Sequence, residues 1–286
     1  MPANLLSAIA NITGFHNNDL RKYSSRYLNR VNAVGEQLEF FVKDAAAGCF
    51  EKPQKDKEAI YSKVFSWLGN QNNPPDFIIG KGDAFEIKKI ESPKSILALN
   101  SSPPKNKLHS DDPRILEACM LCEGQNGWKD KDIFYVVGNA KGGIIKYLFF
   151  VHGLCYAADR SVYEKVHSKL KAEISETMSS MGLEASETIE LGRVAKVDPL
   201  GITELRMRGM WEIQNPISVY PGIFGFNASD QFTLVALVEK SKYESFPRED
   251  RAKLEKNKAI DIKNVKVKDP NNPAKLIDAK VIKAVW

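Results

Sequence analysis

The first third of the chain has hydrophobic residues at helical spacing. Leu5, Ile9 and Ile12 share one face of a short predicted helix. Apolar residues three and four positions apart then run through residues 20–48, and a further amphipathic segment covers residues 57–68. The pattern therefore predicts three helices before the first strand of the chain.

The period of the pattern changes after this helical region. An apolar run at 77–79, a glycine-containing turn at 80–83 and an alternating segment at 84–90 predict a β-hairpin. Successive side chains of a strand point to opposite faces of a sheet. Glu86 and Lys88 are therefore expected on one face of the second strand.

Beyond this hairpin the pattern predicts helices and strands in mixed order. Residues 92–113 are polar and rich in turn-forming residues, which predicts a long loop that is either functional or disordered. The helix predicted at 161–181 has an apolar stripe that runs from Val162 to Ile174. Other predicted elements are a helix at 114–122, strands at 132–138, 144–152 and 231–238, and edge strands or a peripheral arm in the lysine-rich segment 253–283.

Composition is that of a globular protein able to bury a sizeable core, because 43% of the 286 residues are hydrophobic and 27% are charged. This length suits one large domain or two small ones, and no clean linker divides the chain, so we expect a single domain over residues 1–286. The formal net charge of +5 is compatible with a nucleic-acid partner. No stretch approaches the roughly 20 apolar residues of a membrane span, and the start lacks an export signal, so we expect a soluble protein.

The cysteines and histidines do not indicate a metal-binding framework. Four cysteines are too few and too scattered for a disulfide scaffold, so a reduced, cytoplasmic compartment is expected. Cys119 and Cys122 form a single Cys-x-x-Cys, whereas zinc sites usually contain two such pairs, and a helix near the core is the better interpretation. His152 and His167 have no metal-ligand spacing to each other and are interpreted as structural.

A candidate catalytic group lies in the hairpin. The Asn- and Pro-rich loop 69–75 cannot continue a helix and leads to Asp76, which the hairpin brings near Glu86 and Lys88. Carboxylate oxygens are hard ligands suited to Mg²⁺, and an ammonium beside them can orient a water or offset charge on a phosphate. The pattern resembles the active-site signature of the PD-(D/E)XK nucleases. The alternative is a solvent-facing hairpin whose charges are ordinary surface groups.

Basic and polar residues offer candidates for DNA contact. Arg206 and Arg208 alternate with apolar residues, so a strand would present both guanidinium groups on one face, which suits guanine or phosphate. The alternative is a salt-bridged strand surface. The loop 92–113 follows the predicted catalytic strand and offers further groups to phosphates or base edges. They are Lys94, Asn100, Lys105, Lys107, His109 and the neighbouring serines.

Several longer segments resemble the NgoPII family of type II restriction endonucleases. Segments of this length are stronger evidence than the spacing of Asp76, Glu86 and Lys88. The part of the chain after about residue 239 matches little, and its role is open. The matching segments are Asn-Ala-Val-Gly at 32–35, Gly-Asn-Gln-Asn-Asn-Pro-Pro-Asp at 69–76, Ser-Pro-Lys-Ser at 92–95, Ala-Leu-Asn-Ser-Ser at 98–102, Lys-Leu-His-Ser-Asp at 107–111 and Val-Asp-Pro-Leu-Gly-Ile-Thr at 197–203.

The resemblance implies an α/β fold with a PD-(D/E)XK core, in which helices flank a mixed central sheet and additional strands follow at the C-terminal end. It implies Mg²⁺-dependent hydrolysis of double-stranded DNA at the palindrome GGCC, by an enzyme that is paired with a cognate DNA methyltransferase. A palindromic site mirrors a two-fold protein, so a homodimer that cuts both strands is expected.

The resemblance also assigns roles to residues. Asp76 and Glu86 would bind Mg²⁺, and Lys88 would position the attacking water. PD-(D/E)XK nucleases often have a further acid on a preceding helix, and the segment 35–41 matches its usual local form. Glu39 is favoured over Glu36 because it stands beside the apolar stripe, and the alternative is a solvated acidic face. The candidates for reading or positioning DNA are Lys94, Asn100, His109, Arg206 and Arg208.

Two other functions fit the same residues. A different PD-(D/E)XK nuclease, acting in repair or on DNA structure, would cut without preference for a palindrome. A DNA-binding protein without catalysis would carry Asp76, Glu86 and Lys88 as surface charges. Cleavage of DNA into discrete fragments in the presence of Mg²⁺ distinguishes both from a restriction enzyme.

Overall fold

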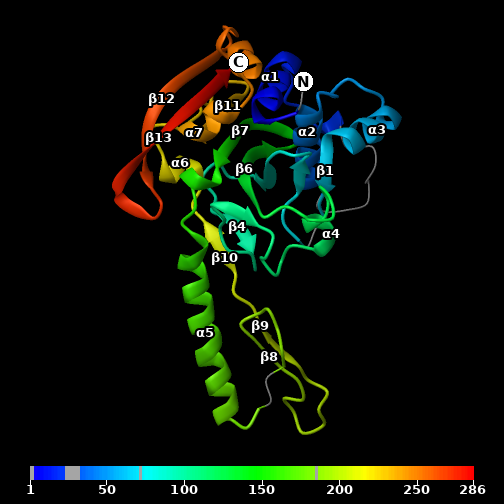
Figure 1. Ribbon diagram of the computed structural model, residues 1–286, viewed down its shortest axis with the longest axis vertical. Coiled ribbons are helices and arrows are strands. Elements are labelled where there is room, and N and C mark those ends of the chain that lie inside the picture. The colour runs from blue at the N-terminus through cyan, green and yellow to red at the C-terminus, as the bar shows by residue number, and fades with distance from the viewer. Residues whose placement is uncertain (1–2, 23–32, 71–72, 184–185) are drawn as a thin grey trace.

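A mixed sheet forms the centre of the molecule in this computed structural model, which describes residues 3–22, 33–70, 73–183 and 186–286 (Figure 1). The strands follow the order β1-β2-β3-β6-β7-β11-β13-β12, and β5 pairs with the start of β6. The pairs β3–β6 and β7–β11 are parallel, and the other pairs are antiparallel. The bounds are β1 Phe65–Leu68, β2 Phe77–Ile79, β3 Ala84–Ile90, β5 Lys107–His109, β6 Asp130–Lys141, β7 Ile144–His152, β11 Thr233–Glu239, β12 Ile260–Asp269 and β13 Asn272–Val285.

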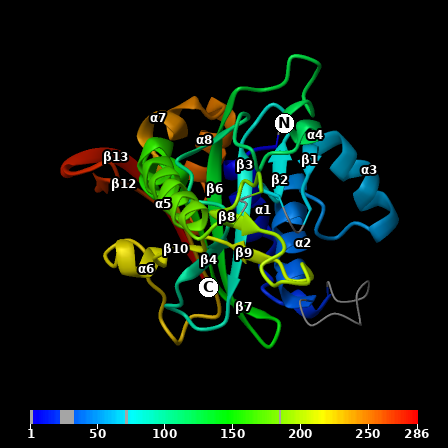
Figure 2. The ribbon, with the colours of Figure 1, turned by 90° about the horizontal axis from the view of Figure 1, so that it is seen from below.

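Helices cover one face of this sheet. Alternate strand residues such as Phe85, Phe134 and Phe150 pack there against the apolar sides of the helices, because a strand sends every second side chain to the same face. Figure 2 shows α1, α2 and α3 together on one side of β3 and β6. The helices of this face are α1 Leu5–Phe15, α2 Ala33–Ala47, α3 Gln54–Val64, α7 Lys240–Ser245 and α8 Arg248–Glu255.

Shorter elements cover the opposite face. Tyr135, Phe149 and Val235 point there and form a second core cluster with Leu97 and Phe224. The sheet is thus buried on both faces, which explains the nearly continuous apolar runs in β7 and β11. The elements here are the strand pair β4 Leu97–Asn100 and β10 Trp211–Ile213, the helices α4 Glu117–Met120 and α6 Pro216–Val219, and the 3₁₀ turn Gly153–Cys155.

A projecting arm extends from the body of the molecule. It consists of helix α5 Arg160–Ser180 and the antiparallel pair β8 Gly192–Val194 and β9 Leu205–Met207 (Figure 1). The apolar stripe predicted for this helix lies largely on its surface, because Val162, Val166 and Leu170 are 47–48% exposed. Helical period therefore placed the helix correctly, although the stripe does not face the core of the body.

Three predicted helices are shorter than the pattern indicated. The helix predicted from residue 20 begins at Ala33 within the described residues, since 20–22 form a 3₁₀ turn and 23–32 lie outside them. Helix α3 ends at Val64, and Phe65–Leu68 form a strand because they pair with β2. The helix predicted at 114–122 is confined to α4. In each case long-range pairing or loop geometry overrode the local helical period.

Two segments, one predicted as a long loop and one as edge strands or a peripheral arm, contain paired strands. The polar segment 92–113 contains β4 and β5, because Leu97, Leu99 and Leu108 are buried and both strands find distant partners. In the lysine-rich tail, β13 lies inside the central sheet between β11 and β12. Of the two strands in this tail, β12 lies at an edge of the sheet and β13 does not, so the C-terminal part completes the sheet rather than forming a peripheral arm. No helix among the described residues combines the length and apolar character needed to cross a bilayer.

Candidate active site

Asp76 is held where β2 begins to separate from β3. Its backbone N–H donates to the carbonyl oxygen of Phe85 (3.0 Å), and its Oδ2 accepts the backbone N–H of Ile87. Phe77 pairs with Phe85 in the hairpin, so Asp76 lies across from Glu86. The hairpin predicted from the sequence is confirmed, and it brings the two carboxylates together by backbone pairing alone.

Gly69 sets the path of the chain on the other side of Asp76. Its N–H donates to the carbonyl oxygen of Asp76 (2.8 Å). A Cβ atom at this position would lie 2.3 Å from the carbonyl oxygen of Pro75, a distance that no side chain can occupy. Glycine therefore allows β1 and the segment before β2 to approach closely, and this approach positions the Asp76 carboxyl group.

Glu86 and Lys88 lie on the same face of β3, as predicted. The Lys88 Nζ is 2.8 Å from Glu86 Oε1, and the two side chains are only 20% and 16% exposed. The other carboxylate oxygen, Glu86 Oε2, is buried and has no hydrogen-bond partner among the described residues. A buried carboxylate oxygen without a donor is costly unless a cation or another donor reaches it.

The charges of this group act strongly on one another. Burial, together with the carboxylates of Glu86 and Glu39, raises the pKa of Asp76 well above its ordinary value. Burial lowers the pKa of Lys88, but the carboxylates of Glu86 and Asp76 outweigh it, so its pKa is raised and Lys88 is a cation. Negative charge is thus concentrated where a divalent cation would relieve the repulsion.

Helix α2 supplies the third acid. Glu39 is the helix residue whose charge raises the pKa of Asp76, and its Oε1 is 2.5 Å from the Nζ of Lys43 one turn later. The helix packs closely on β6 because Gly138 has no side chain, and a Cβ there would lie 2.5 Å from a methyl carbon of Leu38. This packing brings the negative charge of Glu39 close to the two hairpin carboxylates.

These residues fit a magnesium ion held mainly by two carboxylates. In the described residues, no group of three or more His, Cys, Asp or Glu side chains is arranged to hold a metal ion. Asp76 and Glu86 would therefore be the protein ligands, with Glu86 Oε2 free to coordinate. Mg²⁺ suits such a site because it keeps several waters and binds through one or two carboxylates.

From the sequence, Lys105 was only a candidate for DNA contact, and the buried polar contacts around it were not predicted. Lys105 is buried, and its Nζ lies 2.9 Å from Asp112 and 2.8 Å from the hydroxyl of Ser102. Burial lowers the pKa of Lys105, while Asp112 and then Glu86 act in the opposite direction. The backbone N–H of Lys105 also donates to the hydroxyl of Tyr135, the residue that pairs with Glu86 across the sheet. The cluster of short motifs at 98–111 was the sequence signal for this region.

Comparison with known proteins shows the family of this chain. The model of the NgoPII restriction endonuclease family matches residues 3–268. The chain is 41% identical over 280 residues to the type II restriction enzyme NgoPII of Neisseria gonorrhoeae, covering 98% of both chains. The chain belongs to the NgoPII family of type II restriction endonucleases. It is therefore a site-specific deoxyribonuclease, and no solved structure matches it.

Two of the DNA-contact candidates in this NgoPII-family enzyme lie on the chain that follows β3. Lys94 is exposed in the turn that follows β3. Asn100 ends β4 with a positive φ of 53° and pairs with Trp211 of β10. His109 lies elsewhere, at the end of β5, where its Nδ1 is 2.5 Å from Asp130 at the start of β6. The three residues are therefore not brought together.

The remaining candidates of the NgoPII-family chain lie on the arm. Arg206 is in β9, and Arg208 follows it. Both guanidinium groups reach the same carboxylate, with nitrogens 2.7 Å and 2.6 Å from Glu190 Oε1. Their side chains remain about half exposed. The predicted shared face is confirmed, and it is a salt-bridged surface that still presents two cations to solvent.

The cysteine pair and the two histidines of this NgoPII-family enzyme differ in their surroundings. Cys119 is buried in α4, near the core as predicted, and Cys122 follows the helix. His152 is fully buried with its ring stacked on Phe134 at 4.9 Å, which fits a structural role. His167 is half-buried and lines an open cavity, so its surroundings do not support the structural role predicted for it.

Proposed function

We propose that this enzyme hydrolyses double-stranded DNA at the palindrome GGCC in a Mg²⁺-dependent reaction, using a PD-(D/E)XK core. The observation that carries this proposal is the buried pair Asp76 and Glu86, with an unpartnered carboxylate oxygen, next to the cation Lys88. The pair lies at the β2–β3 hairpin of a mixed sheet flanked by helices, the arrangement expected for that core. Membership of the NgoPII family supports the choice of substrate.

Each residue of the proposed site has a separate role in hydrolysis of the phosphodiester. Asp76 and Glu86 would hold Mg²⁺, which supplies positive charge that polarises a phosphate and lowers the pKa of bound water. Lys88, held as a cation by Glu86, orients the attacking water and offsets the charge that develops on phosphorus. Glu39 adds negative field from α2. The products are a 5′-phosphate and a 3′-hydroxyl.

We also propose that the enzyme acts as a homodimer, because a palindrome presents the same half-site twice. The guanine acceptors and cytosine donors of GGCC lie in the major groove, and the candidates to contact bases or phosphates are Lys94, Asn100, His109, Arg206 and Arg208. Residues 1–286 form one endonuclease domain in this proposal. It acts in the cytoplasm beside a methyltransferase that protects host DNA.

Digestion of a sequenced plasmid tests the function directly. Purified protein is incubated with and without Mg²⁺, and the ends of the fragments are sequenced. Discrete cuts at GGCC that require Mg²⁺ are expected. Discrete cuts at another sequence would keep the nuclease and reject GGCC, whereas well-folded protein that cuts nothing in Mg²⁺ or Mn²⁺ would reject the catalytic assignment.

A further inference from the structure

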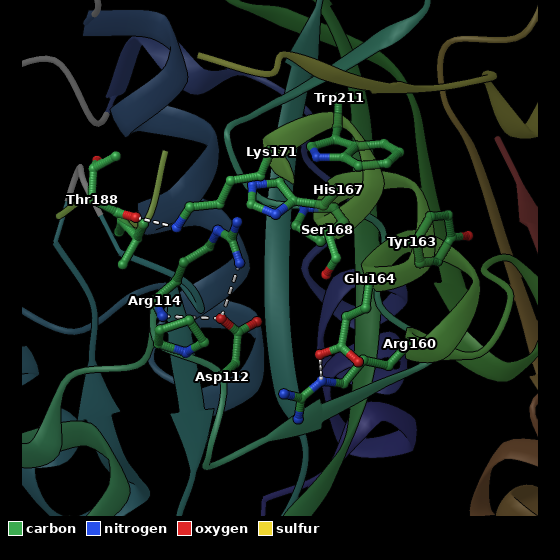
Figure 3. Close-up of a pocket in the computed structure, with 13 residues that line it drawn as sticks. Asp112, Arg114, Arg160, Tyr163, Glu164, His167, Ser168, Lys171, Thr188 and Trp211 are labelled. Atoms are coloured by element: carbon green, nitrogen blue, oxygen red, sulfur yellow. Dashed lines mark hydrogen bonds and ion pairs between the residues drawn. The ribbon is translucent and has the colours of Figure 1, made fainter. Parts of the chain in front are cut away.

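A cavity of about 380 Å³ lies between helix α5 of the arm and the body of the molecule. The α5 side chains His167 and Lys171 point toward it, one turn apart, and Tyr163 lines it one turn before His167 (Figure 3). The segment 112–114 forms another wall, and Trp211 closes one end. The cavity therefore lies where the arm joins the body.

Nitrogen-bearing side chains converge in this cavity. Figure 3 shows the guanidinium of Arg114, the ring of His167 and the ammonium of Lys171 directed into the same space. Arg114 and Lys171 both act on His167, whose pKa is lowered by burial and then by these two positive charges. Three nitrogen-bearing side chains from two separate segments are thus brought together.

The acidic groups of the cavity are already engaged by cations. Asp112 is shared between Lys105 at 2.9 Å and Arg114 at 3.3 Å, and Glu164 pairs with Arg160. Lys171 donates to the carbonyl oxygen of Thr188 and has no carboxylate partner among the described residues. The cavity therefore has an excess of positive charge, and a bound anion would neutralise it.

The cavity is connected to the catalytic group through its wall. Lys105 forms an ion pair with Asp112, and the Glu86 carboxylate acts on the pKa of Lys105. Arg114 is fixed on the same wall, because its Nε donates to the carbonyl oxygen of Ser101 (2.9 Å). DNA that places one phosphate at the acidic group would therefore pass this cavity with a neighbouring part of the same backbone.

We propose that Arg114, His167 and Lys171 form a binding site for a phosphodiester group of the DNA backbone, adjacent to the group that is cut. This inference rests on the proposed cleavage of DNA. An ammonium and a guanidinium fixed from different elements suit phosphate oxygens, and such contacts set the register of a protein on DNA without reading bases. Tyr163 and Trp211, whose rings are 5.6 Å apart, offer apolar contact to the sugar.

Lys171→Ala tests the proposal against a matched control on the same helix. Lys169 is 76% exposed, pairs with Glu173 and does not line the cavity, so Lys169→Ala removes the same charge from α5. Binding of a GGCC duplex and of a duplex without GGCC is measured in EDTA by fluorescence anisotropy over a range of salt concentrations. Steady-state cleavage in Mg²⁺ gives kcat and KM for the same proteins.

Loss of one phosphate contact has a defined signature. The slope of log K against log salt should fall by about 0.9 in Lys171→Ala, and binding to both duplexes should weaken about five- to tenfold near 0.1 M salt. KM should rise by a similar factor while kcat changes little. Lys171→Arg should restore most of the affinity, and Lys169→Ala should leave the slope and KM unchanged.

A neutral phosphate analogue locates the contact. In wild type, a methylphosphonate at one position beside the cut site should weaken binding, and the same replacement should have a smaller effect in Lys171→Ala, where only Arg114 and His167 remain. Inorganic phosphate serves as a competitor. Millimolar phosphate should weaken DNA binding by wild type more than binding by Lys171→Ala. Equal weakening in both proteins would show that free phosphate acts outside this cavity and would count against the proposal.

The outcomes separate this inference from the proposed function. Wild type that cuts at GGCC while Lys171→Ala and Lys169→Ala behave alike would overturn only the phosphate site. If wild type binds duplex and Lys171→Ala shows the expected change of slope, but wild type never cuts, only the proposed function is overturned. Wild type that neither binds nor cuts any duplex would overturn both.

Discussion

The charge state of Lys88 follows from its immediate surroundings. Burial alone would lower its pKa and favour the neutral amine, which could accept a proton. The carboxylate of Glu86 at 2.8 Å and that of Asp76 reverse this effect and keep Lys88 protonated. This charge state supports the proposal that Lys88 orients water and offsets negative charge, rather than acting as a general base.

Lys88→Ala should lower kcat for GGCC cleavage by about 10²- to 10⁴-fold, the usual contribution of a positioned proton-transfer or charge-stabilising group. Binding of the duplex should change only a few-fold, because the variant leaves the DNA-contacting cations in place. Lys89→Ala is the control, since Lys89 is the next residue of the strand and pairs with exposed Glu91 at 2.6 Å. Single-turnover cleavage in Mg²⁺ measures both. Wild-type rates in Lys88→Ala would exclude Lys88 from catalysis.

His167 gives a pH dependence to the proposed phosphate site. Its pKa is lowered in the free protein by burial, Arg114 and Lys171, whereas Asp112 and Glu164 nearby are engaged by other cations. A bound phosphate would raise that pKa, so binding takes up a proton and tightens as pH falls from about 7.5 to 5.5. Asp76, Glu86 and Glu39 are the same in both proteins, so any pH effect that they cause is common to wild type and His167→Gln. The difference in affinity between the two proteins therefore isolates His167. Affinity is measured by fluorescence anisotropy for both proteins across this pH range. An equal pH dependence of affinity in wild type and His167→Gln would refute a role of His167 protonation in binding.

At the scale of elements, the hairpin and the strand before it position the carboxylates of Asp76 and Glu86. β1 pairs with β2, and the close approach at Gly69 places the peptide that carries Asp76. The loop between them was predicted from its asparagines and prolines. The close contact of Gly69 with Pro75 could not be predicted from the sequence, because it depends on the pairing of β1 with β2.

Gly69→Ala should therefore impair the site without removing any catalytic group. The new Cβ would lie 2.3 Å from the Pro75 carbonyl oxygen and 2.9 Å from that of Asp76, so the backbone must move and Asp76 moves with it. A displacement of this kind lowers kcat by about 10²-fold. Gly14→Ala is the matched control, because a Cβ at Gly14 in α1 meets nothing within 4 Å. Equal cleavage rates for the two variants, each checked for folding by circular dichroism, would show that this approach does not position Asp76.

At the scale of the whole molecule, a buried ionic network joins the C-terminal part to the catalytic hairpin. Lys242 at the start of α7 pairs with Asp83 in the hairpin turn and with Asp132 of β6 at 2.9 Å. The Nε2 of His152 lies 3.5 Å from Asp132. These contacts and the place of β13 inside the sheet show why the C-terminal part contributes to the fold that holds the site.

Asp132→Asn should lower the free energy of unfolding by about 2 kcal/mol near pH 7, the scale of a buried hydrogen bond to a charged group. Burial raises the pKa of Asp132, but His152 and Lys242 outweigh it and the pKa is lowered. A lowered folded-state pKa gives stability that is present above the ordinary value of 3.8 and is lost as pH falls below it. The difference between wild type and variant should therefore shrink from pH 5 to pH 2 in urea titrations. A difference that grows with acid would contradict this sign.

Much of the candidate site could be predicted because its geometry is local. Glu86 and Lys88 share a face by strand alternation, and a short turn returns the chain to Asp76. The pairing of Glu190 with Arg206 and Arg208, and the position of Lys105 between Asp112 and Ser102, were not predicted. No local pattern along the chain relates the residues that these contacts join. Only the folded arrangement of strands and loops brings them together.

The sequence by itself determined the hairpin, the Asp76, Glu86 and Lys88 group and the family, because turn chemistry, side-chain alternation and long matching segments are properties of neighbouring residues. The tertiary structure decided where the elements go. It placed β13 inside the sheet, left the stripe of α5 largely exposed on an arm, and brought His167 beside Arg114. Apolar periodicity shows that a face can be buried, but competition among all such faces for partners decides which faces are.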